Sequence, residues 1–546
     1  MIDRAGSLRL INGRIYRFAA DRSPAEAVVV RDGKVAWVGA TRDAPAAADT
    51  IDLQGATVLP GLTDAHIHLF AIAYGRLLVP LGRAHAASVG DVVARIRAQA
   101  ATTPKGEWVH AAEFDENHLA EHRYPTRDEL DAAIPDHPVL IRRFCGHIAI
   151  VNGAALRALE IDEGISEVQG GVFGRGADGR LDGSATEAAA ELIFRRLPPI
   201  SHATLAQSLH ATIDDCLRMG MTAAVEAAVG FTSGFDEEFA VWRVARGDSV
   251  HLPMRLGFMH QLDPEEAVAR GLVPTRDPDW QEMTLKFFAD GIVGGRTSAV
   301  SEDYCDTPTR GFFMRPEADL KRVIVAAHEA GWQVAVHATG DRAVACVIDA
   351  YEAGQGRVAW PDPRHRIEHF FCPPRDGFAR MQRLGALIVM QPSFLTRMRR
   401  SIEQAFGPRR HDKYPGRSAL AAGVHYVASS DAPTGLTSPW AGMADAVDRG
   451  LPDGEPIGPN EALTPREAVA AYIHGGAYAM KQESWRGVLA PGMAADLIVP
   501  DRDPLTDAAP DLRGVNVLMT MVRGVIHHDA AFSRAGRNAV APAGRV

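Results

Sequence analysis

Cysteine is scarce in this chain, which has five in 546 residues and no CxxC pair among them. Scattered thiols in an odd number exclude a disulfide framework and a thiolate zinc site, and they indicate a reducing compartment. The opening segment MIDRAGSLRLINGRIYR lacks the apolar stretch of a secretory signal, and no apolar run approaches membrane-spanning length. We therefore expect a cytoplasmic protein that does not act at a membrane.

An excess of basic residues is also missing. The 58 Lys and Arg residues stand against 68 Asp and Glu, which gives a formal charge of −10, and no local basic cluster offsets it. This balance disfavours nucleic acid and anionic lipid as partners. No glycine-rich phosphate loop follows a predicted strand, so a nucleotide site is not expected either. We therefore expect neither nucleic acid nor a membrane as partner.

Short strands joined by turns are predicted at both ends of the chain. The N-terminal end contains LRLINGRIYR, AVVVRDGKVAWVG and IDLQGATVLPG, with Asn-Gly and Asp-Gly turn signals. The C-terminal end contains RGVLAPGMAADLIVPDRDP and VLMTMVRGVIHH. We predict that residues 1–57 and 485–546 pair into one small β-sandwich.

Strands and helices alternate through the middle of the chain. After ATVLPGLTDAHIH, apolar strands such as LKFFADG, QVAVHA and ALIVMQP are separated by helical stretches. Eight strands with intervening helices favour an α/β fold, a (β/α)8 TIM barrel over residues 58–484. The rhythm breaks at about residues 71–200, which is too long for a connecting loop. We interpret this segment as an inserted subdomain over the barrel mouth.

The first strand of this barrel ends in the motif His66-Ile67-His68. Residues two apart on a strand point to the same face, so both imidazoles could bind one cation. A single HxH motif is weak evidence by itself.

Four further residues lie at the ends of later predicted strands. Lys286 shares a strand face with Asp290, and a lysine in so apolar a strand must be paired, neutral or modified. His337 and His369 each end a strand and would converge on the barrel axis, although either one alone is more often a core histidine. Asp431 ends the eighth strand, where an N-cap is the plainer explanation.

The ordered set His-x-His, Lys, His, His and Asp resembles the amidohydrolase superfamily. Within it, the chain is similar to the amidohydrolase family 3 group, which includes N-substituted formamide deformylase-like proteins. The resemblance extends over nearly the whole chain, and its motifs are PGLTDAHIH, GHIAIVN, GRLDGSATE, LKFFADG, VHATGDRAV, RIEHF, SSDAP and PGMAADLIV.

The resemblance implies a role for each motif residue. His66 and His68 would bind the more buried metal, and a carboxylated Lys286 would bridge to a second metal held by His337 and His369. Asp431 would contact the first metal and accept a proton from the attacking water. Histidine and carboxylate ligands favour zinc, with one or two ions per chain left open. The resemblance also offers His147 and Asn152 as substrate-binding candidates, with a structural turn as the alternative. We add Glu187, for which the alternative is an acid in the first turn of a helix, and Asp290, the strand neighbour of the lysine.

A divalent ion, which activates water, and a nearby carboxylate together predict a metal-dependent hydrolase. The resemblance implies that this hydrolase is an amidohydrolase, which cleaves a C–N bond in an amide or N-substituted formamide of a small molecule. Hydrolysis of a lactone or ester, or deamination of a ring, would use the same scaffold. A non-catalytic binding protein is the remaining alternative, and it is disfavoured because none of the six ligands is missing. The sequence leaves open whether the chain is a monomer or a homodimer.

Overall fold

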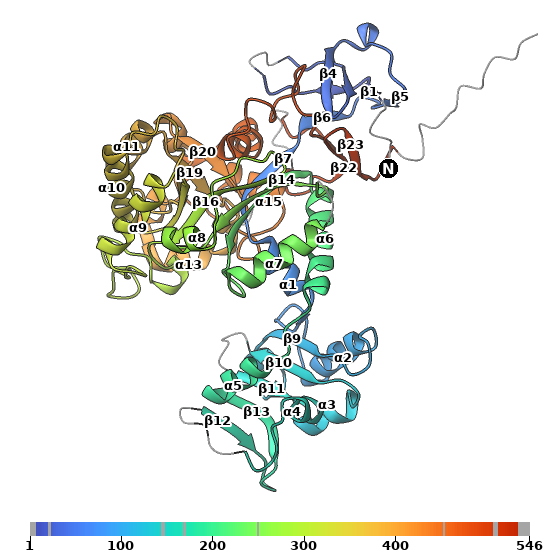
Figure 1. The fold of residues 1–546 in the computed structure, drawn as a ribbon, viewed down its shortest axis with the longest axis vertical. Coiled ribbons are helices and arrows are strands. Elements are labelled where there is room, and N and C mark those ends of the chain that lie inside the picture. The colour runs from blue at the N-terminus through green and yellow to red at the C-terminus, as the bar shows by residue number, and fades with distance from the viewer. Residues whose placement is uncertain are drawn as a thin grey trace, which may run out of the picture. The chain divides into compact units, whose positions relative to one another are not determined.

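A computed structural model describes residues 7–19, 23–143, 148–165, 168, 171–247, 251–450, 454–505 and 511–532. The chain divides into two compact units (Figure 1). The larger contains Met1–Ile72 and Leu209–Val546, and the smaller is Ala73–Ser208.

Eight parallel strands form one sheet in the larger unit, in the order β20-β19-β18-β17-β16-β15-β14-β7. The two outer strands approach each other at their ends, because the Asp431 N–H donates to the His66 carbonyl at 2.7 Å and the His68 N–H donates to the Ala432 carbonyl at 2.9 Å. This nearly closed barrel is the predicted TIM-barrel architecture. Its strands are β7 (Leu62–Ile67), β14 (Met221–Val229), β15 (Arg255–His260), β16 (Trp280–Phe288), β17 (Gln333–Ala338), β18 (Arg366–His369), β19 (Leu387–Met390) and β20 (His425–Ala428).

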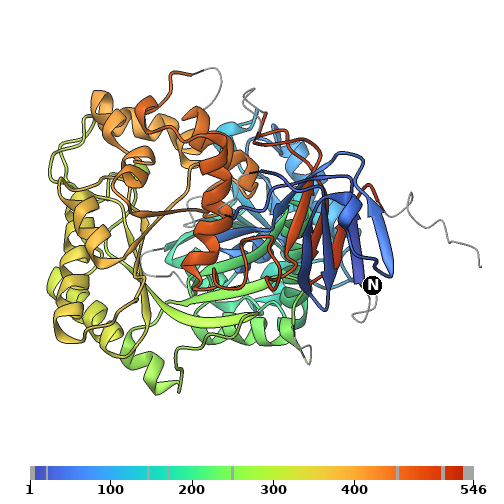
Figure 2. The ribbon, with the colours of Figure 1, turned by 90° about the horizontal axis from the view of Figure 1, so that it is seen from above.

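The connecting helices lie outside the ring of strands, as both ribbon views show (Figure 1, Figure 2). The chain leaves the barrel after β7 and returns to it before β14, so the smaller unit is inserted at that connection. The α-helices that follow or precede the barrel strands are α1 (Leu69–Arg76), α6 (His202–Arg218), α7 (Phe235–Arg246), α8 (Pro264–Ala269), α9 (Glu317–Glu329), α10 (Asp341–Arg357), α11 (Gly377–Leu384), α12 (Phe394–Arg397), α13 (Arg399–Phe406), α14 (Arg417–Ala421), α15 (Pro439–Asp448), α16 (Pro465–Ala470) and α17 (Gly476–Ala479).

A buried pair of histidines links helix α9 to the barrel wall. The backbone N–H of Val334 donates to His365 Nδ1 at 3.0 Å, so the proton of this ring is on Nε2, which lies 2.8 Å from His328 Nδ1. His328 Nε2 then donates to the Val358 carbonyl at 2.8 Å. This chain of bonds requires both rings to be neutral. Burial, followed by the proximity of His328, lowers the pKa of His365 well below its usual value.

Folding stability should therefore fall as the pH drops below about 6.5, the pKa of an unfolded histidine. Below that pH the unfolded chain takes up a proton at His365 that the folded chain refuses, at a cost of about 1.4 kcal/mol per pH unit until the folded ring is also protonated. Replacing His365 with Gln should make the decline in Tm between pH 7.5 and 5.5 smaller. The matched control is His85→Gln at an exposed position, and an unchanged decline in the His365 variant would contradict the assignment.

The ends of the chain form two small sheets in the larger unit. One has the order β4-β3-β1-β5, and the other, β2-β6-β21-β22-β23, mixes N- and C-terminal strands, which lie side by side in both views (Figure 1, Figure 2). Apolar side chains of the two sheets pack into one cluster. The strands are β1 (Ser7–Ile11), β2 (Arg14–Ile15), β3 (Ala27–Arg31), β4 (Lys34–Gly39), β5 (Asp49–Asp52), β6 (Thr57–Pro60), β21 (Leu497–Pro500), β22 (Val517–Val522) and β23 (Val525–Asp529).

The predicted Asp-Gly turn joins β3 to β4. Asp32 and Gly33 both have positive φ, 50° and 75°, as the tightest hairpins require.

The smaller unit contains a six-stranded sheet in the order β12-β13-β11-β10-β9-β8. Its core consists of two apolar clusters of its own. Its elements are β8 (Val79–Pro80), α2 (Val89–Ala100), β9 (Val109–Phe114), α3 (Arg127–Ala133), β10 (Val139–Arg143), β11 (Ile148–Val151), α4 (Gly153–Ala158), β12 (Gly171–Arg175), β13 (Leu181–Glu187) and α5 (Ala188–Arg196). Across the described ranges of both units, no helix has the length and apolar character needed to span a bilayer.

Candidate metal centre

Three of the predicted ligands meet at the carboxyl end of the barrel. One donor atom from each of His66, His369 and Asp431 lies within 4.8 Å of the other two. These residues come from β7, β18 and the segment after β20, which are far apart in the sequence. The carboxyl ends of parallel strands share one face of a barrel, and this is where active sites of such folds form.

Asp431 connects both residues of the His-x-His motif. Its Oδ1 lies 3.3 Å from His66 Nε2 and 3.1 Å from His68 Nε2. Burial raises the pKa of Asp431, but His66, His68 and His369 outweigh burial and hold this pKa well below its ordinary value. The carboxylate is therefore charged at neutral pH. Asp431 and His369 also have positive φ, 52° and 76°, and such backbone strain is concentrated at functional sites.

A buried carboxylate fixes the proton of the His66 ring. Glu368 Oε2 lies 2.5 Å from His66 Nδ1, and Arg366 Nε and Nη2 donate to the two oxygens of Glu368 at 2.6 and 3.0 Å. Burial raises the pKa of Glu368, but the charge of Arg366 and the hydrogen bond from His66 more than reverse this, so that the pKa is held far below its ordinary range. The ionised carboxylate accepts the Nδ1 proton, which leaves the lone pair of His66 on Nε2, the nitrogen that faces Asp431.

A hydrogen bond to one ring nitrogen also fixes the orientation of His369 and of His337. His369 Nδ1 lies 2.7 Å from Gln391 Oε1, and this oxygen is identified because the amide nitrogen of Gln391 faces the Val389 carbonyl. His337 Nε2 donates to the Gly291 carbonyl at 2.9 Å. Each ring therefore keeps one nitrogen with a free lone pair. Burial, then the charge of Lys286, lowers the pKa of His337 to about 4, so the ring is neutral, as a metal ligand must be.

Lys286 is buried in β16 with 1% of its surface exposed. Its Nζ lies 5.1 Å from the centre of the Phe288 ring, and among the described residues no carboxylate forms an ion pair with it. Burial lowers the pKa of this amine to about 8, even though Glu368 and Asp431 favour the charged form. This amine therefore loses its proton more easily than an exposed lysine does. That Lys286 is paired, neutral or modified stays a prediction.

Asp290 is one of the residues predicted to bind substrate. Asp290 is fully buried and accepts bonds from Ala299 N, Thr339 N and Oγ1, and Gly340 N. It therefore ties together the loops after β16 and β17. Burial raises its pKa to about 7.

Asn152 belongs to the smaller unit and caps α4. Its Oδ1 accepts the N–H groups of Ala155 and Val139, and its Nδ2 donates to the carbonyls of Ile134 and His137. Every hydrogen-bonding position of this amide is used within the unit. Glu187 is exposed immediately before α5, and His147 lies outside the described residues.

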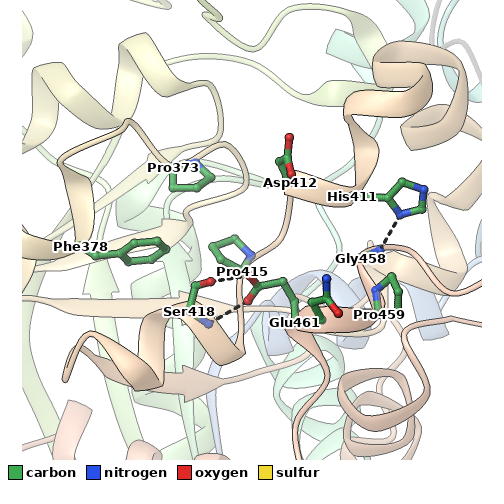
Figure 3. Close-up of a pocket in the computed structure, with 10 residues that line it drawn as sticks. Pro373, Phe378, His411, Asp412, Pro415, Ser418, Gly458, Pro459 and Glu461 are labelled. Atoms are coloured by element: carbon green, nitrogen blue, oxygen red, sulfur yellow. Dashed lines mark hydrogen bonds between the residues drawn. The ribbon is translucent and has the colours of Figure 1, made fainter.

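A separate cavity of about 310 Å³ lies near the loops after β18 and β19. It is lined by residues such as His411, Ser418 and Glu461, and it includes none of the predicted ligands (Figure 3). The Glu461 carboxylate accepts the N–H groups of Gly416 and Ser418 and the Ser418 hydroxyl. These bonds anchor the start of α14, so the Glu461 carboxylate has a structural role there.

A parallel barrel that gathers histidines and a carboxylate at its strand ends is suited to holding a divalent metal ion. The chain belongs to the amidohydrolase family, whose family model matches residues 49–528.

Similar proteins cover nearly the full length of the chain. The N-substituted formamide deformylase of Arthrobacter pascens is 30% identical, over 96% of this chain and 98% of its own length. YtcJ of Bacillus subtilis (strain 168) is 29% identical, over 95% of this chain and 98% of its own. The crystal structure of an uncharacterized metal-dependent hydrolase from Pyrococcus furiosus aligns with a TM-score of 0.72 and 26% identity, over 92% of this chain and 100% of that one.

Proposed function

We propose that this protein is a metal-dependent amidohydrolase that cleaves the C–N bond of an amide or N-substituted formamide of a small molecule. The observation that carries the proposal is the set of three buried histidines whose second nitrogens are all held by acceptors. An acceptor on the second ring nitrogen is the usual support of a metal-bound histidine. The similarity to a deformylase favours a C–N bond over other carbonyl substrates.

The donor set fits one or two divalent ions, with zinc as the first choice for imidazole and carboxylate ligands. His66, His68 and Asp431 would hold one ion, and His337 and His369 the other. In two-metal sites the ions are about 3.5–4 Å apart, so ligands of both positions fall within one cluster, as His66, His369 and Asp431 do. A bound ion would polarise the substrate carbonyl and lower the pKa of water.

Lys286 would bridge the two positions as a carbamate. Its neutral amine attacks the carbon of CO2, an N–C bond forms, and the nitrogen releases one proton, which leaves a carboxylate on the side chain. The burial and the lowered amine pKa support this assignment, because only the neutral amine has a lone pair for the attack.

Asp431 is the proposed proton carrier. Its ionised carboxylate would accept a proton as water adds to the substrate carbonyl, and it would deliver that proton to the departing amine nitrogen. The net reaction consumes one water and yields a carboxylic acid and an amine.

The proposal also covers the cellular compartment, the partners and the domain organisation of the protein. We propose a cytoplasmic protein acting on a small molecule, with neither nucleic acid nor a membrane as partner. The free thiols Cys216, Cys305, Cys346 and Cys372 support a reducing compartment. We also propose that the two terminal sheets form a β-sandwich from residues 1–57 and 485–546, around a barrel of residues 58–484 with an insertion at about 71–200.

Metal removal combined with a substrate panel tests this function. The protein is stripped with a chelator, reloaded with zinc, and assayed on N-substituted formamides, N-acyl amines, lactones and ring amines. We expect stripping to lower amide hydrolysis by more than about a hundredfold and zinc to restore it. Activity confined to lactones or to ring deamination would contradict the C–N assignment, and the absence of any metal uptake would favour a binding protein.

A further inference from the structure

A large apolar side chain lies exposed beside the predicted metal ligands. Phe231, two residues beyond the end of β14, has 57% of its surface exposed. Its ring stacks on Phe288, with ring centres 5.7 Å apart and planes inclined by 21°. The centre of the Phe231 ring is also 5.4 Å from that of His68. Single exposed apolar residues are common on protein surfaces, but this ring lies beside polar side chains that converge, and binding sites combine such polar groups with aromatic walls.

The loop that carries Phe231 is anchored. Glu238 of α7 is 1% exposed, and its carboxylate accepts the N–H groups of Gly230, Thr232 and Ser233, each at 2.6 Å. The backbone on both sides of Phe231 is therefore fixed by one buried side chain, and its ring is held in place while remaining accessible.

Phe288 extends this aromatic surface across the centre. Its ring centre lies 5.4 Å from that of His337, and its face is 5.1 Å from Lys286 Nζ. The two phenyl rings thus run from His68, in the first proposed ligand group, to His337, in the second. A substrate whose carbonyl reaches this centre would have its adjoining group next to Phe231 and Phe288.

We propose that Phe231 and Phe288 form an aromatic subsite, and that the substrate carries an aromatic ring next to its scissile amide. This inference rests on the proposed function. An aromatic ring gains both burial of its apolar surface and offset stacking on Phe231, whereas a small alkyl group gains little of either. The subsite selects the substituent of the amide and takes no part in proton transfer.

The test compares amides that share one acyl group and differ in the N-substituent: methyl, cyclohexyl and phenyl. The zinc-loaded full chain is assayed as wild type, Phe231→Ala and Phe312→Ala. Phe312 is the matched control, because it is 56% exposed and among the described residues its ring stacks on no other. Metal content is measured for each variant, and all three proteins should hold the same amount.

We expect the wild type to prefer the phenyl substrate over the methyl one by about tenfold or more in kcat/KM. Phe231→Ala should lose about ten- to a hundredfold on the phenyl substrate, chiefly through KM, and less than about threefold on the methyl one. Phe312→Ala should keep the preference.

A wild type that hydrolyses these amides without aromatic preference would overturn the subsite and leave the proposed function standing. The subsite is equally overturned if Phe231→Ala lowers all three activities by the same factor, or if Phe312→Ala loses the preference as well. A preference for cyclohexyl equal to that for phenyl would replace an aromatic subsite by a merely apolar one, which also overturns the proposal. A zinc-loaded wild type that hydrolyses no amide would instead reject the proposed function, and the inference with it.

Discussion

Asp431→Asn should retain its metal and lose about a hundredfold to ten-thousandfold in kcat, the range that a positioned proton carrier contributes. The amide keeps an oxygen where Oδ1 now lies, near His66 Nε2 and His68 Nε2. It cannot accept the proton of an attacking water, because its basicity is lost along with its charge. The measurement pairs steady-state kinetics with elemental analysis of metal per chain.

His66→Ala is the contrasting variant. It removes the Nε2 atom that would bind the metal, and it leaves Glu368 without its imidazole partner. We therefore expect loss of both metal and activity, while the circular dichroism spectrum stays that of a folded barrel. Comparison of the two variants distinguishes a role of Asp431 as proton carrier from a role as metal ligand. If Asp431→Asn loses as much metal as His66→Ala, then Asp431 acts chiefly as a ligand, and its role as the proton carrier is wrong.

The barrel could be predicted from the sequence because its determinants are local. Apolar strands alternate with amphipathic helices, and each strand of such a barrel ends at the same face. The motif around His66 and the positions of His369 and Asp431 then follow from strand order alone. The structure brings the donor atoms of these three residues together, although no two of them are close in sequence.

The residues that hold the ligand side chains in place could not be predicted from strand order. Glu368 contacts His66 across 302 positions of sequence, and β18 and β7 are not neighbours in the sheet. The contact therefore exists only once the sheet has curled into a barrel. A clue is present in RIEHF, where Arg366 and Glu368 alternate with Ile367 in a fully buried strand, since charged groups in a buried strand must pair.

In the inserted segment, the sequence suggests a ligand-binding role for a side chain that has a structural role. Asn152 is a candidate for substrate binding on sequence grounds because its motif resembles one that faces substrate in related proteins. An amide that caps a helix and an amide that binds a ligand look alike in sequence, as both require polar groups near a turn. The structure distinguishes them through the partners of the side chain: four backbone groups occupy the amide of Asn152.

Lys286→Ala should remove the bridge between the two metal positions. If Lys286 carries a carbamate, the wild type will hold about two metal ions per chain, whereas the variant will hold about one or fewer and lose more than about a hundredfold in kcat. A cavity remains where the side chain was, because the site is fully buried. Acetate or propionate can enter that space, supply the missing carboxylate, and restore part of the activity and the second ion.

The carbamate has a further requirement that distinguishes it from an unmodified lysine. Its carbon comes from CO2, so reloading of stripped wild type with zinc should be slower and less complete in CO2-free buffer than with bicarbonate. Lys286→Ala should show no bicarbonate dependence, which makes it the matched control. About one ion per chain in the wild type, without effect of bicarbonate, would instead assign Lys286 a structural role beside a single metal, because an unmodified ammonium cannot bridge two cations. The hydrolase would then rely on a single ion, with Asp431 still beside His66 and His68.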